Sequence, residues 1–319
     1  MAEYSLLFPG QGSQFVGMGK DLYAKYAAAK EIYDKADDIL SMALSRLCFE
    51  GPVEELNDTA NTQPAIFVTS YAALKVLEQE FGQTLQPMAG AGHSLGEYTA
   101  LAAAGSLSFE DGLKLVYARG SLMKSAGEKA AGGMTVVIGA DVSALKKFIK
   151  KIAETNNQVL KIANDNCPGQ IVISGSPAAL QEFESNYKES GAKFVKRLPV
   201  SVACHTPLMA DAQKEFDAIL TQTPINPAKF DVIANTSAKP IRSPQEIRKE
   251  LTNQLCGLVL WTQTSNYLDE IGCTRFLEIG PKKVLCGLTK RTLPQAECTG
   301  FNSVPDIEAA LQFLQTEKE

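Results

Sequence analysis

Short apolar runs that end in glycine punctuate the first third of the chain. Residues 4–8 are almost all apolar and are followed by Pro9-Gly10-Gln11-Gly12-Ser13. A second run, 86–92, ends in Gly92 and is followed by an apolar helical pattern over 95–104. Runs of this length bounded by turn residues are typical of buried strands. The pattern therefore predicts a buried strand before each glycine-rich turn, with a helix after the second.

Residues 128–199 show an order of their own. Apolar positions predict strands at 134–138, 159–164, 170–175 and 193–198, and helices at 143–154 and 177–191. The order β-α-β-β-α-β is that of a ferredoxin-like unit. Because Gly132-Gly133 and Pro199 punctuate its two ends, we expect 128–199 to form a small inserted domain.

The rest of the chain continues to alternate strands and helices. Ser108-Phe109-Glu110-Asp111 has the pattern of a capping box, which predicts a helix from there to about residue 126. A strand is expected at 200–203, followed by His205 and by Thr206-Pro207 as the start of a helix. Further strands are expected near 232–235 and 275–279. Such alternation predicts an α/β fold with a mainly parallel sheet, formed by 1–127 and 200–319.

Composition narrows the classes of function. The 319 residues include 31 Lys plus Arg against 36 Asp plus Glu, a net charge of −5, which argues against non-specific binding to nucleic acid. No apolar stretch is long enough to span a membrane, and the N-terminus lacks the pattern of a signal peptide. Seven cysteines without a CxxC pair favour neither a disulfide framework nor a metal site. We therefore expect a cytoplasmic protein that acts away from the membrane.

A candidate nucleophile follows the second predicted strand. Gly92-His93-Ser94-Leu95-Gly96 is a G-x-S-x-G segment between a predicted strand and a predicted helix. In a nucleophile elbow the sharp turn exposes the serine above the sheet, and a side chain at either glycine would clash with the neighbouring strand and helix. The N–H of the next residue, Leu95, would then point at a developing oxyanion. An incidental turn is the alternative.

A serine hydroxyl needs a base, and the chain has only two histidines. His93 is adjacent to Ser94, so an elbow would turn its side chain away from the nucleophile. His205 falls between a predicted strand and a predicted helix, whose positive end would keep its imidazole neutral. A histidine that only packs locally is the alternative. Cys204 points to the opposite side of an extended segment and is expected to fill the core.

Arg119 lies on an apolar row of the helix predicted from Ser108, with no charged or polar residue at helical spacing. Such an arginine either extends its head to solvent or meets a buried anion, and its planar fork suits a carboxylate. The Gly10-Gln11-Gly12 loop lacks the Lys-Ser/Thr of a P-loop, so we interpret it as a backbone oxyanion donor.

With these residues in place, the sequence resembles the malonyl-CoA:acyl carrier protein transacylases of bacterial type along nearly its whole length. The resemblance is carried by Phe8-Pro9-Gly10-Gln11-Gly12-Ser13-Gln14, Thr62-Gln63-Pro64-Ala65, Gly92-His93-Ser94-Leu95-Gly96-Glu97-Tyr98, Asn164, Asn166, Pro168-Gly169-Gln170, Pro199-Val200-Ser201-Val202, His205, Gln254, Trp261 and Glu278-Ile279-Gly280-Pro281. It implies an α/β-hydrolase-like large domain with an inserted ferredoxin-like small domain, and an active site between the two.

The resemblance also implies roles for individual residues. It makes Ser94 the residue that is malonylated and His205 the general base and then the acid. The N–H groups of Gln11 and Leu95 would form the oxyanion hole, Arg119 would bind the malonyl carboxylate, and the Gln254 carbonyl would orient His205. His93, Asn164 and Asn166 would line the substrate pocket. Two departures from the family pattern, Cys204 and Leu258, lie near the base.

The implied reaction moves malonyl from malonyl-CoA to the phosphopantetheine thiol of an acidic acyl carrier protein and supplies fatty-acid elongation. It needs no bound cofactor or metal, and we expect a monomer. Basic residues in two short segments could dock the carrier: Lys193, Lys196, Arg197, Lys282 and Lys283. Scattered solvated charge is the alternative for these segments. Two other functions stay open, a serine hydrolase or thioesterase acting on acyl thioesters and a non-catalytic carrier-binding subunit.

Overall fold

The computed structural model describes residues 4–315, apart from the side chain of Asn156. Its larger sheet has six strands in the order β10-β9-β1-β2-β7-β8. All neighbouring pairs run parallel except β7 and β8. The strands are β1 (Tyr4–Phe8), β2 (Ala89–Gly92), β7 (Asp231–Ile233), β8 (Pro240–Ile241), β9 (Arg275–Ile279) and β10 (Glu297–Phe301). The expected α/β fold with a mainly parallel sheet is confirmed.

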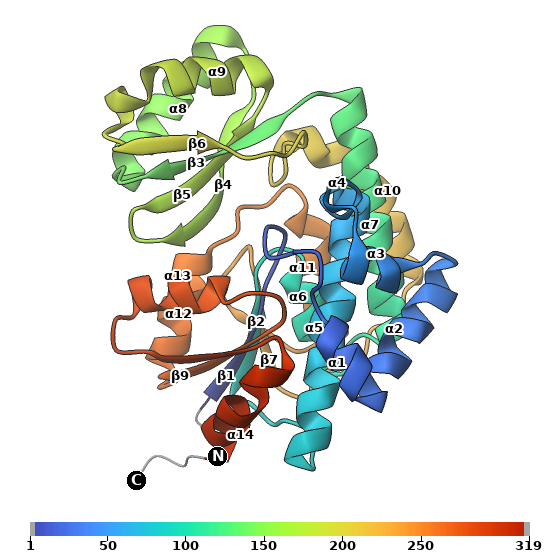
Figure 1. Cartoon of the computed structure of the whole chain (residues 1–319). Helices are drawn as coiled ribbons and strands as arrows, with labels where there is room; N and C mark the ends of the chain where they lie inside the picture. The colour runs from blue at the N-terminus through green and yellow to red at the C-terminus, as the bar shows by residue number, and fades with distance from the viewer. Residues whose placement is uncertain (1–3, 316–319) are drawn as a thin grey trace.

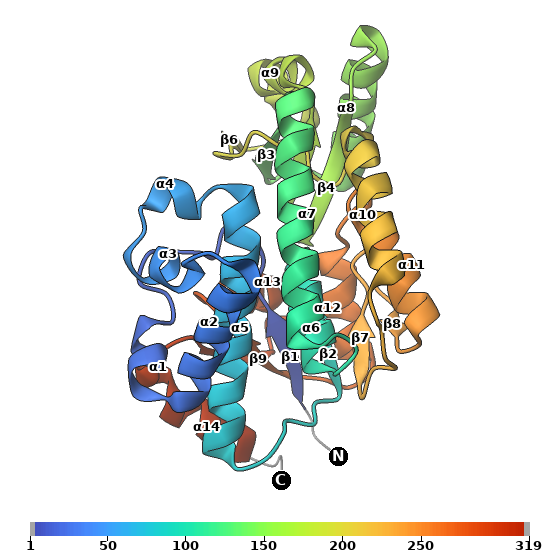
Figure 2. The same ribbon diagram turned by 90° about the vertical axis from the view of Figure 1, so that its right-hand side faces the viewer.

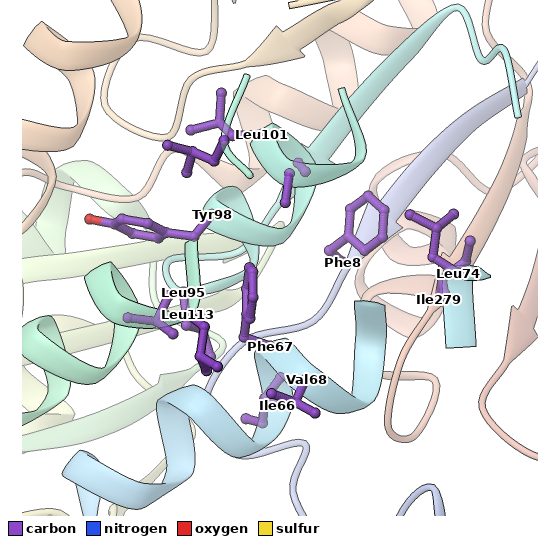
Figure 3. Close-up of a cluster of buried hydrophobic side chains, with 14 of the residues drawn as sticks. Phe8, Ile66, Phe67, Val68, Leu74, Leu95, Tyr98, Leu101, Leu113 and Ile279 are labelled. Atoms are coloured by element: carbon purple, nitrogen blue, oxygen red, sulfur yellow. The ribbon is translucent and has the colours of Figure 1, made fainter. Parts of the chain in front are cut away.

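Helices cover both faces of this sheet. Successive side chains of a strand point to opposite faces, and on β1 Leu6 packs into one core while Leu7 packs into another. The Leu7 side is covered by α12 (Trp261–Glu270) and α13 (Val284–Thr292). The Leu6 side is covered by the other helices of this part of the molecule: α1 (Lys20–Lys25), α2 (Ala27–Leu40), α3 (Leu44–Glu50), α4 (Val53–Leu56), α5 (Thr59–Phe81), α6 (Gly96–Ala103), α7 (Phe109–Lys129), α10 (Ala210–Gln222), α11 (Pro244–Gln254) and α14 (Ile307–Gln315). Figure 3 shows Phe8, Phe67 and Tyr98 among the side chains of the core on the Leu6 side.

The two long helices α5 and α7 pack closely against each other, side by side in Figure 2. Glycines on α7 allow this approach. A Cβ at Gly112 would lie 2.6 Å from the Phe67 ring, and one at Gly120 would lie 2.7 Å from the Thr59 carbonyl oxygen. The close packing carries Arg119, which precedes Gly120, into the interior.

The smaller sheet has four antiparallel strands in the order β4-β5-β3-β6. The strands are β3 (Gly133–Ile138), β4 (Leu160–Cys167), β5 (Gln170–Gly175) and β6 (Phe194–Arg197), and the helices are α8 (Val142–Asn156) and α9 (Pro177–Asn186). This topology is the expected ferredoxin-like one. The two helices pack on one face of the sheet, and Figure 1 shows the other face turned toward the larger sheet.

A backbone bridge joins the smaller sheet to the segment before α12. The N–H of Val259 donates to the Ala163 carbonyl, and the N–H of Asp165 donates to the Val259 carbonyl, both at 2.9 Å. Thr262 adds a side-chain hydrogen bond to the Asp165 carboxylate at 2.6 Å. Strand β4 is therefore held against the segment that leads into α12.

The structure corrects several boundaries. Residues 200–203 form no strand; they pass across the end of α7, where Cβ atoms at Gly127 and Gly132 would meet Ser201 and Ala203. Helix α9 ends at Asn186, and a 3-10 turn completes the predicted helical span.

The start of α7 has part of the predicted capping box. Ser108 caps the helix by accepting the Asp111 N–H. No reciprocal bond from Asp111 to the Ser108 N–H is found among the hydrogen bonds of residues 4–315, so the box is half formed.

Candidate active site

The turn between β2 and α6 has the geometry of a nucleophile elbow. Ser94 has φ of 52°, a left-handed conformation that costs a non-glycine residue free energy. A Cβ at Gly92 would lie 2.0 Å from the Gly96 carbonyl carbon, and a Cβ at Gly96 would lie 2.0 Å from the Phe8 carbonyl oxygen. Both glycines are therefore required by close contacts, as the sequence predicts.

His205 faces Ser94 from a second left-handed position, with φ of 59°. Its Nε2 lies 2.9 Å from the Ser94 Oγ, and its Nδ1 lies 2.9 Å from the carbonyl oxygens of both Gln254 and Gly257. Carbonyl oxygens only accept hydrogen bonds, so Nδ1 carries the proton and the neutral ring presents Nε2 as an acceptor. The Ser94 hydroxyl is thus set to donate to His205.

The environment keeps this imidazole neutral. Burial, and next the positive charge of Arg119, lower the pKa of His205 to about 3. Accepting carbonyls at Nδ1 act in the opposite direction but do not offset them. The residues that follow form a short 3-10 turn, Pro207–Met209, before α10 begins. Desolvation and Arg119 therefore account for the neutral base without the helix dipole that the sequence suggested.

Arg119 is buried, with 1% of its surface exposed, so its head does not extend to solvent. One guanidinium nitrogen donates to the Gln63 side-chain oxygen at 2.8 Å, and the other donates to Ser94 Oγ and the Gln254 side-chain oxygen, both at 3.1 Å. Its Nε has no hydrogen-bond partner. Within residues 4–315 no carboxylate lies in ion-pair distance of Arg119. A buried cation beside the candidate nucleophile therefore lacks an anion.

The loop after β1 lies directly against the elbow. A Cβ at Gly10 would be 2.3 Å from the His93 carbonyl oxygen, so only glycine allows this approach. Gln11 and Leu95 both line the cavity at Ser94. Among the hydrogen bonds of the described residues, neither backbone N–H has an acceptor. Two free N–H donors thus border the space above the serine.

The cavity between the two sheets has a volume of about 380 Å³. On one side it is lined by Ser94 in the turn after β2, by Arg119 on α7 and by His205, and on the other side by the smaller sheet. The residues of the smaller sheet that line it are Met134, Val136, Asn164, Asn166, Gln170 and Val172. His93 points away from Ser94 Oγ and bonds to the Asn166 side chain at 2.8 Å. The expected pocket residues His93, Asn164 and Asn166 are therefore brought together.

Sequence reasoning missed three polar residues beneath the site. Gln63 holds Arg119 from α5, and Asn235 holds the elbow from just after β7. Glu97, fully buried on α6, accepts the Asn235 N–H at 3.1 Å. Burial, and then the nearby Glu250, raise the pKa of Glu97 well above its usual range. The available signals were weak: a Gln within an apolar helix and an Asn directly after an apolar run.

The predicted docking residues do not form one free surface. Arg197 makes a two-point ion pair with Glu184, and Lys283 pairs with Asp306. Lys282 donates to the Gly12 carbonyl at 3.1 Å. Lys193 and Lys196 are exposed on or beside the edge strand β6 and have no ion pair within the described part of the chain.

Metal ligation and thiol chemistry have little support among the described residues. No group of three or more His, Cys, Asp or Glu side chains suited to a metal ion occurs within 4–315. All seven cysteines are free thiols, and burial raises the pKa of Cys204 to about 11.

None of the helices in the described residues is long and apolar enough to cross a membrane.

A serine on a strained strand-to-helix turn, bonded to a neutral histidine beside free N–H donors, is the arrangement of an enzyme that transfers acyl groups. The chain belongs to the acyl transferase domain family, whose pattern matches residues 6–315. It is 42% identical to the malonyl CoA-acyl carrier protein transacylase of Bacillus subtilis over 100% of this chain and 99% of that protein. It is 38% identical to the Escherichia coli K12 protein of the same name, over 98% and 100%.

Solved structures agree with this assignment. A malonyl-transacylase in complex with its type II polyketide acyl-carrier protein superposes with a TM-score of 0.93 at 38% identity, covering 98% of this chain and 99% of that one. An acyl carrier protein S-malonyltransferase from Vibrio cholerae superposes with a TM-score of 0.91 at 39% identity, covering 97% and 99%. The fold expected from the sequence is therefore that of this family.

Proposed function

We propose that the protein transfers the malonyl group of malonyl-CoA to the phosphopantetheine thiol of an acyl carrier protein through a malonyl-Ser94 intermediate. The observation that carries this proposal is the buried guanidinium of Arg119, 3.1 Å from Ser94 Oγ and without a carboxylate partner among the described residues. A free carboxylate two carbons beyond the reacting thioester distinguishes malonyl from acetyl, and it would supply the missing anion.

In the first half-reaction the Ser94 hydroxyl gives its proton to His205 Nε2 as its oxygen attacks the thioester carbonyl. The carbonyl oxygen becomes negative and accepts the N–H groups of Gln11 and Leu95. Collapse of this intermediate breaks the carbon–sulfur bond, and the CoA sulfur leaves with the proton held by His205. The product is the malonyl ester of Ser94.

The second half-reaction runs the same steps with a different thiol. The phosphopantetheine thiol of the carrier gives its proton to His205, and its sulfur attacks the malonyl ester. The ester bond breaks, Ser94 recovers the proton from His205, and malonyl leaves on the carrier. Because the Gln254 and Gly257 carbonyls accept from Nδ1–H, they stabilise the transient imidazolium in both halves without a carboxylate.

Arg119 offers a test of donor choice. A lost charge-assisted pair costs about 1.5–3 kcal/mol, or roughly ten- to a hundred-fold in rate. Arg119→Ala should therefore erode the preference for malonyl-CoA over acetyl-CoA by this factor in kcat/KM, and Arg119→Lys should lose less of it. Equal losses on the two donors would remove Arg119 from carboxylate recognition.

The elbow and histidine suit a serine hydrolase or thioesterase equally well, so that function remains the second candidate. It predicts that acyl-CoA is hydrolysed rapidly without a carrier. The transferase predicts a long-lived malonyl-enzyme that a carrier thiol discharges. A non-catalytic carrier-binding subunit is disfavoured by the 2.9 Å contact between Ser94 and His205.

For the carrier we propose docking on Lys193 and Lys196, with Arg197, Lys282 and Lys283 contributing less because of their internal contacts. Basic side chains complement an acidic carrier and raise its association rate. The double variant Lys193→Glu, Lys196→Glu should raise the KM for the carrier and leave that for malonyl-CoA unchanged. Lys146→Glu, Lys147→Glu, exposed on α8, is the matched control. An unchanged carrier KM would remove both residues from the docking surface.

We further propose that a monomer acts in the cytoplasm, without a bound cofactor, and supplies fatty-acid elongation. The free thiols support the cytoplasm, because they suit a reducing compartment. The reaction steps support the lack of a cofactor, because they balance with serine and histidine alone.

We also propose that 128–199 is an inserted domain, because β3 to β6 form their own sheet and core.

A further inference from the structure

The elbow places Ser94 in a backbone conformation that must be held by its surroundings. A non-glycine residue in the left-handed region costs on the order of 1–3 kcal/mol and persists only where neighbouring groups over-determine it. Neither backbone polar group of Ser94 is held by strand pairing. Both are bonded to side chains that come from outside the elbow.

Asn235 provides the main restraint. Its Oδ1 accepts the Ser94 N–H at 2.7 Å, and its Nδ2 donates to the Gly92 carbonyl at 2.7 Å. The orientation of the amide is unambiguous because an N–H only donates and a carbonyl only accepts. One carboxamide thus bridges the two peptide groups on either side of His93.

Asn235 is itself immobilised. It is 1% exposed and follows β7, the neighbour of β2 in the sheet. Its backbone N–H donates to the Glu97 carboxyl at 3.1 Å, and its carbonyl accepts the Leu260 N–H at 2.9 Å. Gln254 Nε2 completes the restraint by donating to the Ser94 carbonyl at 2.9 Å.

We infer that Asn235 is a positioning residue for the acylation of Ser94. It holds the serine in the conformation that directs Oγ to His205 Nε2. It also occupies the Ser94 N–H, which leaves the N–H of Leu95 as the elbow's donor to the oxyanion. The inference rests on the proposed function in one respect, that Ser94 is the residue acylated.

The chemistry of aspartate gives a sharp test. A protonated Asp has one donor and one acceptor, the same pattern as Asn, whereas an ionised one has no donor for the Gly92 carbonyl. Position 235 is 1% exposed and lies beside the Glu97 carboxyl, so burial raises the pKa of the new carboxyl above that of an ordinary aspartate. Asn235→Asp should therefore support acylation at pH 5 and lose it as pH rises through the raised pKa of the new carboxyl. Alanine has no polar side-chain atom, so Asn235→Ala cannot bridge the Ser94 N–H and the Gly92 carbonyl at any pH.

The experiment is rapid-quench acylation by malonyl-CoA, read by intact mass, with steady-state kinetics alongside. We expect Asn235→Ala to lower kcat about a hundred-fold, as misplacement of about 1 Å does, with the KM for malonyl-CoA changed less than about threefold. At pH 5 Asn235→Asp should be at least about tenfold faster than Asn235→Ala. Asn302→Ala, which removes an asparagine bonded to Asp306, is the control for stability loss alone.

A folded Asn235→Ala with wild-type kcat, or Asn235→Asp no faster than Asn235→Ala at pH 5, overturns the inference. Asn235→Ser, too short to bridge both groups, replaces the alanine variant if that protein does not fold. A wild-type protein that malonyl-CoA does not acylate at Ser94 would instead contradict the proposed function. The two failures are therefore distinguishable.

Discussion

The turns that carry Ser94 and His205 share an unusual backbone conformation but are held in it by different contacts. Both residues have a left-handed backbone, at φ of 52° and 59°. The Ser94 turn is held mainly by the side chains of Asn235 and Gln254 and by glycine contacts, with one backbone bond from the Glu97 N–H to the Ser94 carbonyl at 3.2 Å. The His205 turn is held mainly by backbone groups: its N–H donates to the Leu255 carbonyl at 3.0 Å, and its ring donates to two more carbonyls. One side chain contributes, because the Thr206 hydroxyl donates to the Ala203 carbonyl at 2.8 Å.

This difference teaches which substitutions each half of the site tolerates. The nucleophile depends on the identity of two residues far away in sequence, Asn235 and Gln254. The base depends mostly on the backbone path from Gln254 to Gly257, and on the side chain of its neighbour Thr206. Gln254 belongs to both systems, since its side chain bonds to the Ser94 carbonyl and its own carbonyl bonds to His205.

The largest effect should come from breaking the glycine contacts of the elbow. A Cβ at Gly96 would lie 2.0 Å from a backbone oxygen, so Gly96→Ala must displace the turn. We expect the acylation rate to fall by about a hundred- to a thousandfold, because the displaced turn misplaces both the nucleophile and the Leu95 N–H donor. Gly287→Ala is the matched control, because nothing lies within 4 Å of its Cβ. Equal rates for the two variants would contradict the close-contact argument.

The next effect concerns pH and the base. With the pKa of His205 lowered to about 3, the neutral imidazole persists well below pH 6, so acylation should not decline between pH 8 and pH 5. Arg119→Met removes the positive charge that helps to lower the His205 pKa, so the pH at which acylation is lost should rise. Burial remains, so this pH should still lie below the pKa of an ordinary histidine. The check is single-turnover acylation by acetyl-CoA, which has no carboxylate to complicate the comparison. A wild-type limb near pH 6.5 would show that His205 is not desolvated.

A smaller effect separates the two roles of Gln254. Gln254→Ala removes the side-chain bonds to Ser94, Arg119 and Glu97 but keeps the carbonyl that holds His205. Loss of one or two such bonds, at about 1 kcal/mol each, predicts a roughly ten-fold fall in kcat. The pH at which activity is lost should stay that of the wild type. A displaced acid limb would mean that the side chain also orients the histidine.

The smallest effect should follow substitution of Cys204, next to the base. Burial raises its thiol pKa to about 11, so little nucleophilic thiolate forms near neutral pH. Cys204→Ser should keep kcat within about twofold, since a serine can take over the packing and the contact with the Val202 carbonyl. Treatment of the wild type with iodoacetamide should leave activity intact. Rapid inactivation through Cys204 would refute this.

Local sequence signals predicted part of the secondary structure. The apolar runs at Tyr4–Phe8 and Arg275–Ile279 became strands with the predicted bounds, and Ser108 caps α7. Helices α1, α2 and α3 were missed, and none of them has a side-chain cap at its start. Helices α5 and α11 were also missed, although Asp58 and Ser243 cap them. The 200–203 segment alternates like a strand, but it passes across the end of α7 and pairs with no strand of the described residues.

Some residues of the candidate site follow from a local sequence pattern, whereas others come together only in the fold. Ser94 was predictable from a pattern five residues long, and His205 from the scarcity of histidine. Asn235 was not, because its partner lies 141 residues away and only the pairing of β2 with β7 brings them together. Gln63 likewise meets Arg119 only through the close packing of α5 on α7.

The account depends most directly on Ser94 forming a malonyl ester that a carrier thiol removes. The measurement is an intact-mass spectrum after mixing the protein with malonyl-CoA, with acetyl-CoA alongside, followed by addition of acyl carrier protein. We expect a malonyl adduct on the wild type, none on Ser94→Ala, a much smaller acetyl adduct, and discharge by the carrier. Adducts from both donors that decay equally fast without carrier would show a hydrolase and contradict the role given to Arg119.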